Sequence, residues 1–263
     1  MLNDLADFTD AIRHVYREAI SGHGGRLQNG AVLWGQFEST VAACLAGANS
    51  RQLAEKVNEL AVAKILLDDP HLTGPVQYEP DMLPSGRKID FVAARHDDNV
   101  YVEVKSINPK SNESEEAWKR FLKLSEHHPA NVNFITNAGP CGGDIYSRLL
   151  SSRSKFLTNA IEFEERLKEA KEVRQGPGVL VYCCNGIAWD RCDLEDFADF
   201  YHHGAHRQDD LFSIMETHHI AENNITLQRN VDHFGFLKRP AESPPHTEFK
   251  SEVRGPRVFG PVG

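Results

Sequence analysis

The sequence has no run of about 18 apolar residues, the length that a helix needs to cross a membrane. Its five cysteines are irregularly spaced, and an odd number does not complete a disulfide framework. The first residues are acidic and lack the apolar segment of a secretory signal. We therefore expect a cytoplasmic protein with reduced thiols and no membrane partner.

Motifs of several common protein classes are also absent. There is no Gly-x-Ser-x-Gly elbow for a serine nucleophile. The glycine-rich stretch 137–143 lacks the Gly-Lys-Ser/Thr ending of a phosphate-binding loop. Neither Cys-x-x-Cys nor His-Glu-x-x-His occurs, and the adjacent Cys183 and Cys184 would face opposite sides of a strand. These absences weigh against a serine hydrolase, a P-loop protein and a structural zinc site.

An excess of basic charge is missing as well. The 263 residues carry a formal net charge of −9, whereas proteins that bind nucleic acid usually present a basic surface. A local basic patch can coexist with an acidic total, so the charge counts against nucleic-acid binding without deciding it. A hydrophobic content of 40% is ordinary for a globular chain that can bury a sizeable core.

The most informative stretch is 86–107, which predicts two strands joined by a tight turn. Residues 89–94 are apolar except for Asp90, and 100–107 alternate β-branched residues with a second face. The small polar residues between them are typical of hairpin turns. Because side chains two apart in a strand share a face, Glu103 and Lys105 point the same way.

A hairpin that turns symmetrically about residues 96 and 97 places Asp90 opposite Glu103. Both carboxylates then lie within reach of one cation, and the Lys105 ammonium lies beside them. Two carboxylates and a lysine converging on an otherwise β-branched hairpin are costly unless an ion or a substrate uses them. The hairpin therefore predicts a functional site.

The pattern of Asp90 followed thirteen residues later by Glu103-Val104-Lys105 resembles the PD-(D/E)xK nuclease superfamily, over about residues 53–138. Glu-x-Lys also occurs at Glu169 and Glu248, so the tripeptide alone carries no weight. Only the occurrence at Glu103 lies on an expected strand that follows an aspartate on a partner strand.

In this superfamily a glutamate on the helix before the hairpin often joins the metal cluster. Residues 50–69 predict that helix, which Pro70 ends. Glu55 and Glu59 share one of its faces, and we favour Glu59 as the ligand. A solvated helix face is an equal alternative for the pair. The literal Pro80-Asp81 runs into a turn, so we reject Asp81 in favour of Asp90.

The resemblance implies an α/β fold with a restriction-endonuclease-like mixed sheet flanked by helices and extended by helices at both ends. We expect a helical segment at 1–50, the nuclease-like core at 51–190, packing helices at 191–238 and a Pro/Gly-rich tail at 239–263. The remaining expected helices are 2–20, 32–45, 113–128, 194–203 and 211–220, with one or two more in 144–173. In the helix 32–45, one apolar stripe consists of Trp34, Phe37, Val41 and Leu45. The remaining expected strands are 76–79, 131–136 and 179–184.

The resemblance also implies a mechanism, the hydrolysis of phosphodiester bonds with Mg²⁺, for which Mn²⁺ substitutes. Asp90, Glu103, the Val104 carbonyl and Glu59 would hold the metal or its waters. Lys105 would orient the attacking water or stabilise the phosphate. The residues expected to contact the phosphate backbone, with a solvated helix face as their alternative, are Lys110, Lys119, Arg120 and Lys123.

We thus predict a nuclease that favours DNA over RNA and endonucleolytic over exonucleolytic cutting. The main rival is a catalytically inactive module on the same fold that binds nucleic acid or assembles with protein. A weaker rival is a plain buried ion pair between Asp90 and Lys105. The protein partners left open are a second copy of the chain and a protein encoded in the same operon.

Overall fold

The computed structural model describes residues 2–23, 25–48, 50–95, 98–107, 145–184, 191–206, 212–213, 216–238 and 257–259. The expected helix 113–128, the expected strand 131–136 and the four expected phosphate contacts Lys110, Lys119, Arg120 and Lys123 lie outside these residues. Among the described helices, none is long and apolar enough to cross a lipid bilayer.

Three helices precede strand β2 (Val76–Tyr78): α1 (Leu2–Gly22), α2 (Gly30–Leu45) and α3 (Ser50–Asp68). The buried stripe of α2 consists of Leu33, Phe37, Val41 and Cys44. The expected stripe was therefore wrong at Leu45, which is 44% exposed. Position 44 completes the i, i+4, i+8, i+11 spacing of the stripe, whereas position 45 lies at its edge.

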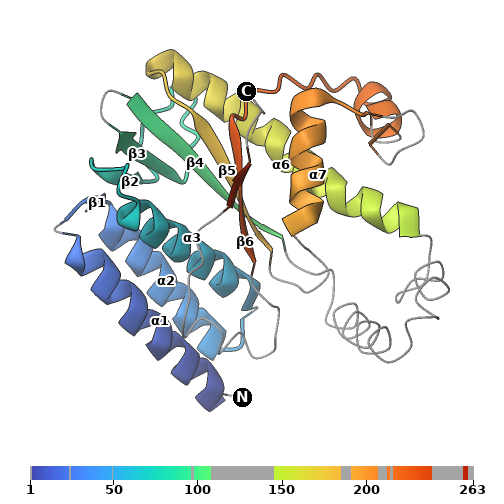
Figure 1. The fold of residues 1–263 in the computed structure, drawn as a ribbon. Coiled ribbons are helices and arrows are strands. Elements are labelled where there is room, and N and C mark those ends of the chain that lie inside the picture. The colour runs from blue at the N-terminus through green and yellow to red at the C-terminus, as the bar shows by residue number, and fades with distance from the viewer. Residues whose placement is uncertain are drawn as a thin grey trace.

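Seven described strands form one mixed sheet in the order β1 to β7 (Figure 1). Their bounds are β1 Leu27–Gln28, β2 Val76–Tyr78, β3 Phe91–Arg95, β4 Asp98–Ile107, β5 Gly178–Cys184, β6 His233–Lys238 and β7 Arg257–Phe259. β2, β3 and β4 form an antiparallel meander, β4, β5 and β6 are parallel, β1 runs parallel to β2, and β7 runs antiparallel to β6.

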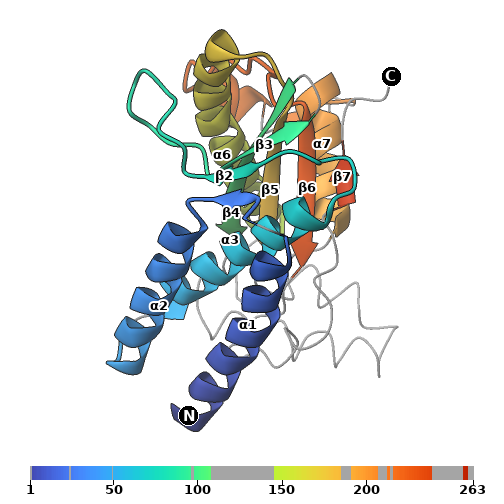
Figure 2. The ribbon, with the colours of Figure 1, turned by 90° about the vertical axis from the view of Figure 1, so that its left-hand side faces the viewer.

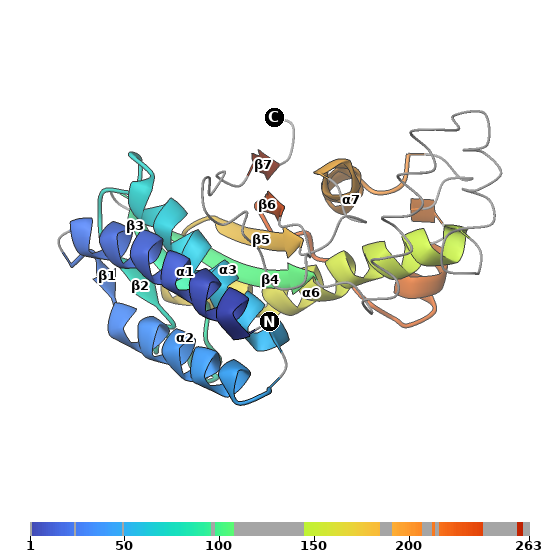
Figure 3. The same ribbon diagram turned by 90° about the horizontal axis from the view of Figure 1, so that it is seen from below.

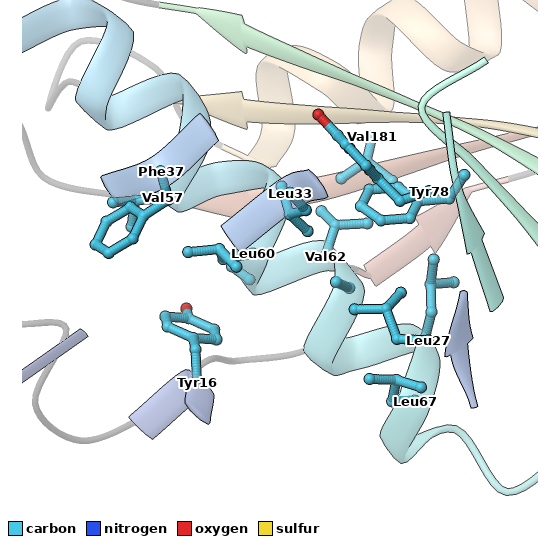
Figure 4. Packing of buried hydrophobic residues seen from close by; sticks show 14 of the residues in the cluster. Tyr16, Leu27, Leu33, Phe37, Val57, Leu60, Val62, Leu67, Tyr78 and Val181 are labelled. Carbon is cyan, nitrogen blue, oxygen red and sulfur yellow. The ribbon is translucent and has the colours of Figure 1, made fainter. Parts of the chain in front are cut away.

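The sheet lies between two layers of helices, with α1, α2 and α3 on one face and α6 (Ile145–Val173) and α7 (Arg191–His203) on the other (Figures 1, 2 and 3). Alternation along the strands divides the core in two. In β4, Val100 and Val102 pack with the N-terminal helices, while Tyr101 and Ile107 pack with α6 and α7. Figure 4 shows from close by part of the core between the sheet and the N-terminal helices. The mixed α/β architecture is therefore confirmed.

The β3–β4 hairpin has the register that the sequence predicts. Phe91 pairs with Val102, and Arg95 pairs with Asp98. Continuing this ladder by one residue sets Asp90 opposite Glu103. The register confirms the symmetric turn, and it positions the two carboxylates at the same level of the sheet.

Helix α6 is continuous, and two polar contacts fix its position. The Tyr101 hydroxyl of β4 donates a hydrogen bond to the carbonyl of Arg174, the residue directly after the end of α6. The buried Glu164 carboxylate accepts hydrogen bonds from the Tyr201 hydroxyl on α7, and from the backbone N–H groups of Gln228 (3.1 Å) and Asn230 (3.0 Å). α6 is thus tied both to the sheet and to the segment that leads into β6.

Several elements differ from the sequence-based expectation. β1 lies outside β2, so residues 76–78 do not form an edge strand. The range 191–238, expected to contain packing helices, also contributes β6 to the sheet. A six-residue π-helical turn, Glu216–Ala221, replaces the end of the helix expected at 211–220. Within the tail, Arg257–Phe259 adds β7 to the sheet next to β6.

Candidate active site

Asp90 is held by backbone groups of both neighbouring strands. Its Oδ2 accepts a hydrogen bond of 2.7 Å from the backbone N–H of Val104. Its own carbonyl accepts one of 2.9 Å from the N–H of Glu79, whose φ of 42° is unusual for a residue with a side chain. These contacts fix the carboxylate of Asp90 against β4, whereas the rejected Asp81 is exposed.

Asp90 lies in an environment that disfavours its charge. Burial raises its pKa well above the usual range, and the carboxylates of Glu103 and Glu59 raise it further. The Val104 N–H and the Lys105 ammonium act in the opposite direction but do not outweigh these effects. A cation bound beside Asp90 would therefore be strongly favoured once the carboxyl group has lost its proton.

Glu103 is the most buried member of the site, at 1% exposure. Its Oε1 receives both the Lys105 ammonium, at 2.9 Å, and the Arg166 guanidinium of α6. Its Oε2 is buried and has no hydrogen-bond partner within the part of the chain that the structure describes. Buried carboxylate oxygens are normally satisfied, so Oε2 marks a position where a cation or a donor is missing.

Arg166 belongs to the site, and our reading of the sequence missed it. It pairs with Glu103 and with Glu162, one turn earlier on α6, and its side chain is 15% exposed. The Lys105 ammonium lies 3.9 Å from the same Glu162 carboxylate. The only sequence signal was the i, i+4 spacing of Glu162 and Arg166 beside the apolar stripe of α6, a pattern shared by many solvated helices.

Glu59 is oriented by β2 and by its own helix. The Tyr78 hydroxyl, in the buried core, lies 2.7 Å from Glu59 Oε2, and the Lys56 ammonium lies 2.8 Å from the same oxygen. The Glu59 side chain is 14% exposed, and its charge contributes to the raised pKa of Asp90. The structure thus places Glu59 near Asp90, while its hydrogen-bond and ion-pair partners are Tyr78 and Lys56.

Glu55, one turn before Glu59 on α3, lines a pocket at the end of β4 instead. Burial raises its pKa, and the Arg51 guanidinium lowers it. The two glutamates that share a helical face therefore have different surroundings: Glu59, the favoured ligand, lies toward Asp90, and Glu55 lies toward the pocket.

The ion pairs at the site correct one of the alternatives. Lys105 does not pair with Asp90 among the described residues; its carboxylate partners there are Glu103 and, more distantly, Glu162. The interpretation of Asp90 and Lys105 as a plain buried ion pair is therefore wrong, because Lys105 pairs with Glu103. The cations instead converge on the deeper carboxylate of Glu103.

The donor set fits a hard cation that keeps its waters. Within the residues that the structure describes, no group of three or more His, Cys, Asp or Glu side chains is arranged to hold a metal ion. Mg²⁺, however, commonly binds through only one or two carboxylates and retains several waters. Asp90 and Glu103, whose Oε2 has no hydrogen-bond partner among the described residues, supply two carboxylates, the number that this smaller requirement needs.

Comparison of the chain with protein-family models, with curated proteins and with solved structures finds no match.

Proposed function

We propose that the chain is a metal-dependent nuclease that hydrolyses phosphodiester bonds, with DNA favoured over RNA and endonucleolytic cutting favoured over exonucleolytic cutting. One observation carries the proposal: the β3–β4 register, continued by one residue beyond the Phe91–Val102 pair, sets Asp90 opposite Glu103, whose buried Oε2 has no hydrogen-bond partner among the described residues. Two carboxylates placed this way form a site whose charge a divalent cation would balance.

Asp90 and Glu103 would hold the metal through their carboxylates, and the resemblance adds the Val104 carbonyl and Glu59. Bound Mg²⁺ would supply an activated water and offset charge on the phosphate. Asp90 must lose its proton before it can serve as a ligand, and the backbone N–H of Val104 keeps its carboxylate in place meanwhile. Glu59, fixed by Tyr78, would accept a hydrogen bond from a water at the site.

Lys105 and Arg166 would act on the substrate. Both are anchored on the same oxygen of Glu103, and both retain donors that this oxygen does not use. The Lys105 side chain is 22% exposed, so its ammonium can reach a phosphate oxygen or the attacking water. Cations held in advance near the developing charge on a phosphate lower the barrier without reorganising during the reaction.

The order of elements supports this assignment. Helix α3 precedes the β2–β3–β4 meander, and helix α6 precedes the parallel strand β5. The helix and strand that the resemblance implies after the hairpin, expected at 113–128 and 131–136, lie outside the described residues, and α6 and the parallel strand β5 follow the hairpin among the described elements. The candidate residues lie on α3, on β4 and directly before β3, so the sheet brings together segments that are distant in the sequence.

A catalytically inactive module on the same fold is the second candidate. Two observations favour it: Lys105 and Arg166 already neutralise Glu103 without a metal, and the formal net charge is −9. Such a module would bind nucleic acid or a partner protein without cleaving phosphodiesters.

Cleavage assays separate the two candidates. Wild-type protein is incubated with plasmid DNA, single-stranded DNA and RNA, each with Mg²⁺, with Mn²⁺ or with EDTA. We expect metal-dependent cleavage, its loss in Asp90→Asn, and its retention in Asp98→Asn, which removes an exposed carboxylate from the same hairpin. Equal activity of wild type and Asp90→Asn, or no activity on any substrate, would refute the nuclease function.

A further inference from the structure

A polar pocket of about 340 Å³ opens beside the candidate active site. Its volume is near the lower end of the roughly 300–1,000 Å³ that is typical of ligand pockets. Three elements form its walls: the start of α3, the end of β4 and the first half of α6. The residues that line it are Arg51, Glu55, Ser106, Ile107, Lys155, Thr158 and Asn159.

The pocket continues the active site along β4. Ser106 and Ile107 directly follow Lys105. At about 3.3 Å per strand residue, Ile107 lies roughly 7 Å beyond Lys105 and on the same face of the sheet. A nucleic-acid strand rises about 3.4 Å along its axis per nucleotide. The offset between Lys105 and the pocket thus corresponds to one or two nucleotide steps.

The lining carries two basic side chains, Arg51 and Lys155, against one carboxylate, Glu55, whose pKa burial raises. Arg51 and Lys155 bring positive charge from opposite walls, and Thr158 and Asn159 add polar groups. Ser106 contributes a donor, because its Oγ already accepts a hydrogen bond of 2.6 Å from the Nδ2 of Asn58 and keeps its own proton to donate.

Asn58 gives independent support for a polar ligand near this wall. It is fully buried on α3, and its Oδ1 has no hydrogen-bond partner in the described ranges. Its amide fixes Ser106 at the base of the pocket. Asn58 therefore holds in place a hydroxyl that lines the pocket.

We propose that this pocket binds a backbone phosphate of the nucleic-acid substrate, one or two nucleotides from the bond that is cut. The assignment rests on the proposed nuclease function and extends it to a residue set on α3 and α6. Arg51 and Lys155 pair with the phosphate, and the Ser106 hydroxyl donates to it. Substrate is thereby aligned along the end of β4, with the scissile phosphate at Lys105.

Binding measured without cleavage tests the pocket. Fluorescence anisotropy of a labelled DNA oligonucleotide is recorded in EDTA over a range of salt concentrations, for wild type, Lys155→Ala and Arg51→Ala. The matched control is Lys168→Ala, which removes an exposed lysine from the same helix thirteen residues away. Inorganic phosphate is the competitor, since it offers the same chemistry without a nucleic-acid backbone.

We expect each pocket variant to weaken oligonucleotide binding about tenfold, as loss of one charged phosphate contact does. The slope of log affinity against log salt should also fall by about one, with Lys168→Ala unchanged in both respects. Wild-type affinity in both pocket variants, or no binding of the oligonucleotide by wild type, would overturn the proposal. Phosphate binding as tight as that of the oligonucleotide would also overturn it, because the site would then serve the free ion.

Cleavage by the same proteins keeps the two proposals separable. Metal-dependent cleavage by wild type together with unchanged binding by Lys155→Ala would refute the pocket and leave the nuclease function standing. Weakened binding by Lys155→Ala together with no cleavage by wild type would refute the nuclease function and retain the pocket as a nucleic-acid site.

Discussion

Replacing Asp90 by Asn should stabilise the protein at neutral pH while removing its response to Mg²⁺. The substitution keeps an oxygen that can accept the hydrogen bond from the Val104 N–H. It removes a charge that burial and the Glu103 and Glu59 carboxylates disfavour. The variant therefore isolates the charge of Asp90 from its structural contact.

The size of the effect follows from the pairing of Asp90 with Glu103. Residues directly opposite in an antiparallel pair have Cβ atoms about 5 Å apart. At that separation, with an effective dielectric constant of about 20, two full charges repel by about 3 kcal/mol. Lys105 and Arg166 screen part of this repulsion, because both pair with Glu103. The hydrogen bond from the Val104 N–H becomes weaker by about 1 kcal/mol when its acceptor changes from a carboxylate to a neutral amide, and this loss reduces the gain further.

A net gain of about 1–2 kcal/mol in the free energy of unfolding remains, which raises Tm by about 2–8 °C for a chain of this size. Its pH dependence has a definite sign. The pKa of Asp90 rises on folding, so wild type loses stability as the pH rises from about 3.8, the ordinary aspartate value, through the folded pKa. The gain in stability of Asp90→Asn over wild type should be absent below about pH 3.8 and complete above the folded pKa of Asp90.

Calorimetry at several pH values, with and without Mg²⁺, provides the measurement. Mg²⁺ at 100 times its Kd should stabilise wild type by about 2.7 kcal/mol and Asp90→Asn much less. Asp98→Asn, which loses an exposed partner of Arg95, should respond to Mg²⁺ as wild type does. Equal destabilisation of Asp90→Asn at low and neutral pH, with no metal response in any of the three proteins, would refute the reasoning.

Three further substitutions test the structure around the site. Glu103→Gln removes the carboxylate that the Lys105 and Arg166 cations share, leaves Glu162 as their charged partner, and should cost about 3–5 kcal/mol in urea unfolding. A change below about 1 kcal/mol would show that the ion pairs with Glu103 do not form. Glu164→Ala removes the acceptor of three hydrogen bonds and should lower the free energy of unfolding by about 2–4 kcal/mol. The control Glu165→Ala, at an exposed position, should change it by no more than about 0.5 kcal/mol. Equal effects of the two substitutions would show that Glu164 does not make these hydrogen bonds. Gly176→Ala brings a Cβ against the Asn99 carbonyl and should cost about 1–3 kcal/mol of stability in thermal unfolding. Gly35→Ala, whose Cβ would enter open space on α2, should stabilise the protein. An unchanged stability of Gly176→Ala would show that residue 176 does not approach the Asn99 carbonyl.

The hairpin and its pair of carboxylates could be predicted from the sequence because their determinants are local. Alternation with a period of two assigns Glu103 and Lys105 to one face, and the polar turn sets the register that places Asp90 opposite Glu103. The strand 179–184 and the helix before it were predictable for a similar reason, since Gly-Pro-Gly separates two clear patterns.

The partners of these carboxylates depended on the tertiary structure. Glu55 and Glu59 share a helical face, and only the packing of α3 against β2 brings Glu59 to the Tyr78 hydroxyl. Arg166 lies 63 residues from Glu103 in the chain, so its pairing depends on how α6 crosses the sheet. No local period encodes that crossing.

The outer strands also depended on long-range contacts. β1 and β7 have two and three residues, too few to show an alternating pattern, and each is defined by its hydrogen bonds to a neighbouring strand. A strand this short has no intrinsic stability, because the entropy of ordering it is offset only when an existing sheet edge supplies its partners. The sequence alone therefore determined the faces of the central elements, and packing across the sheet determined which side chains meet at the site.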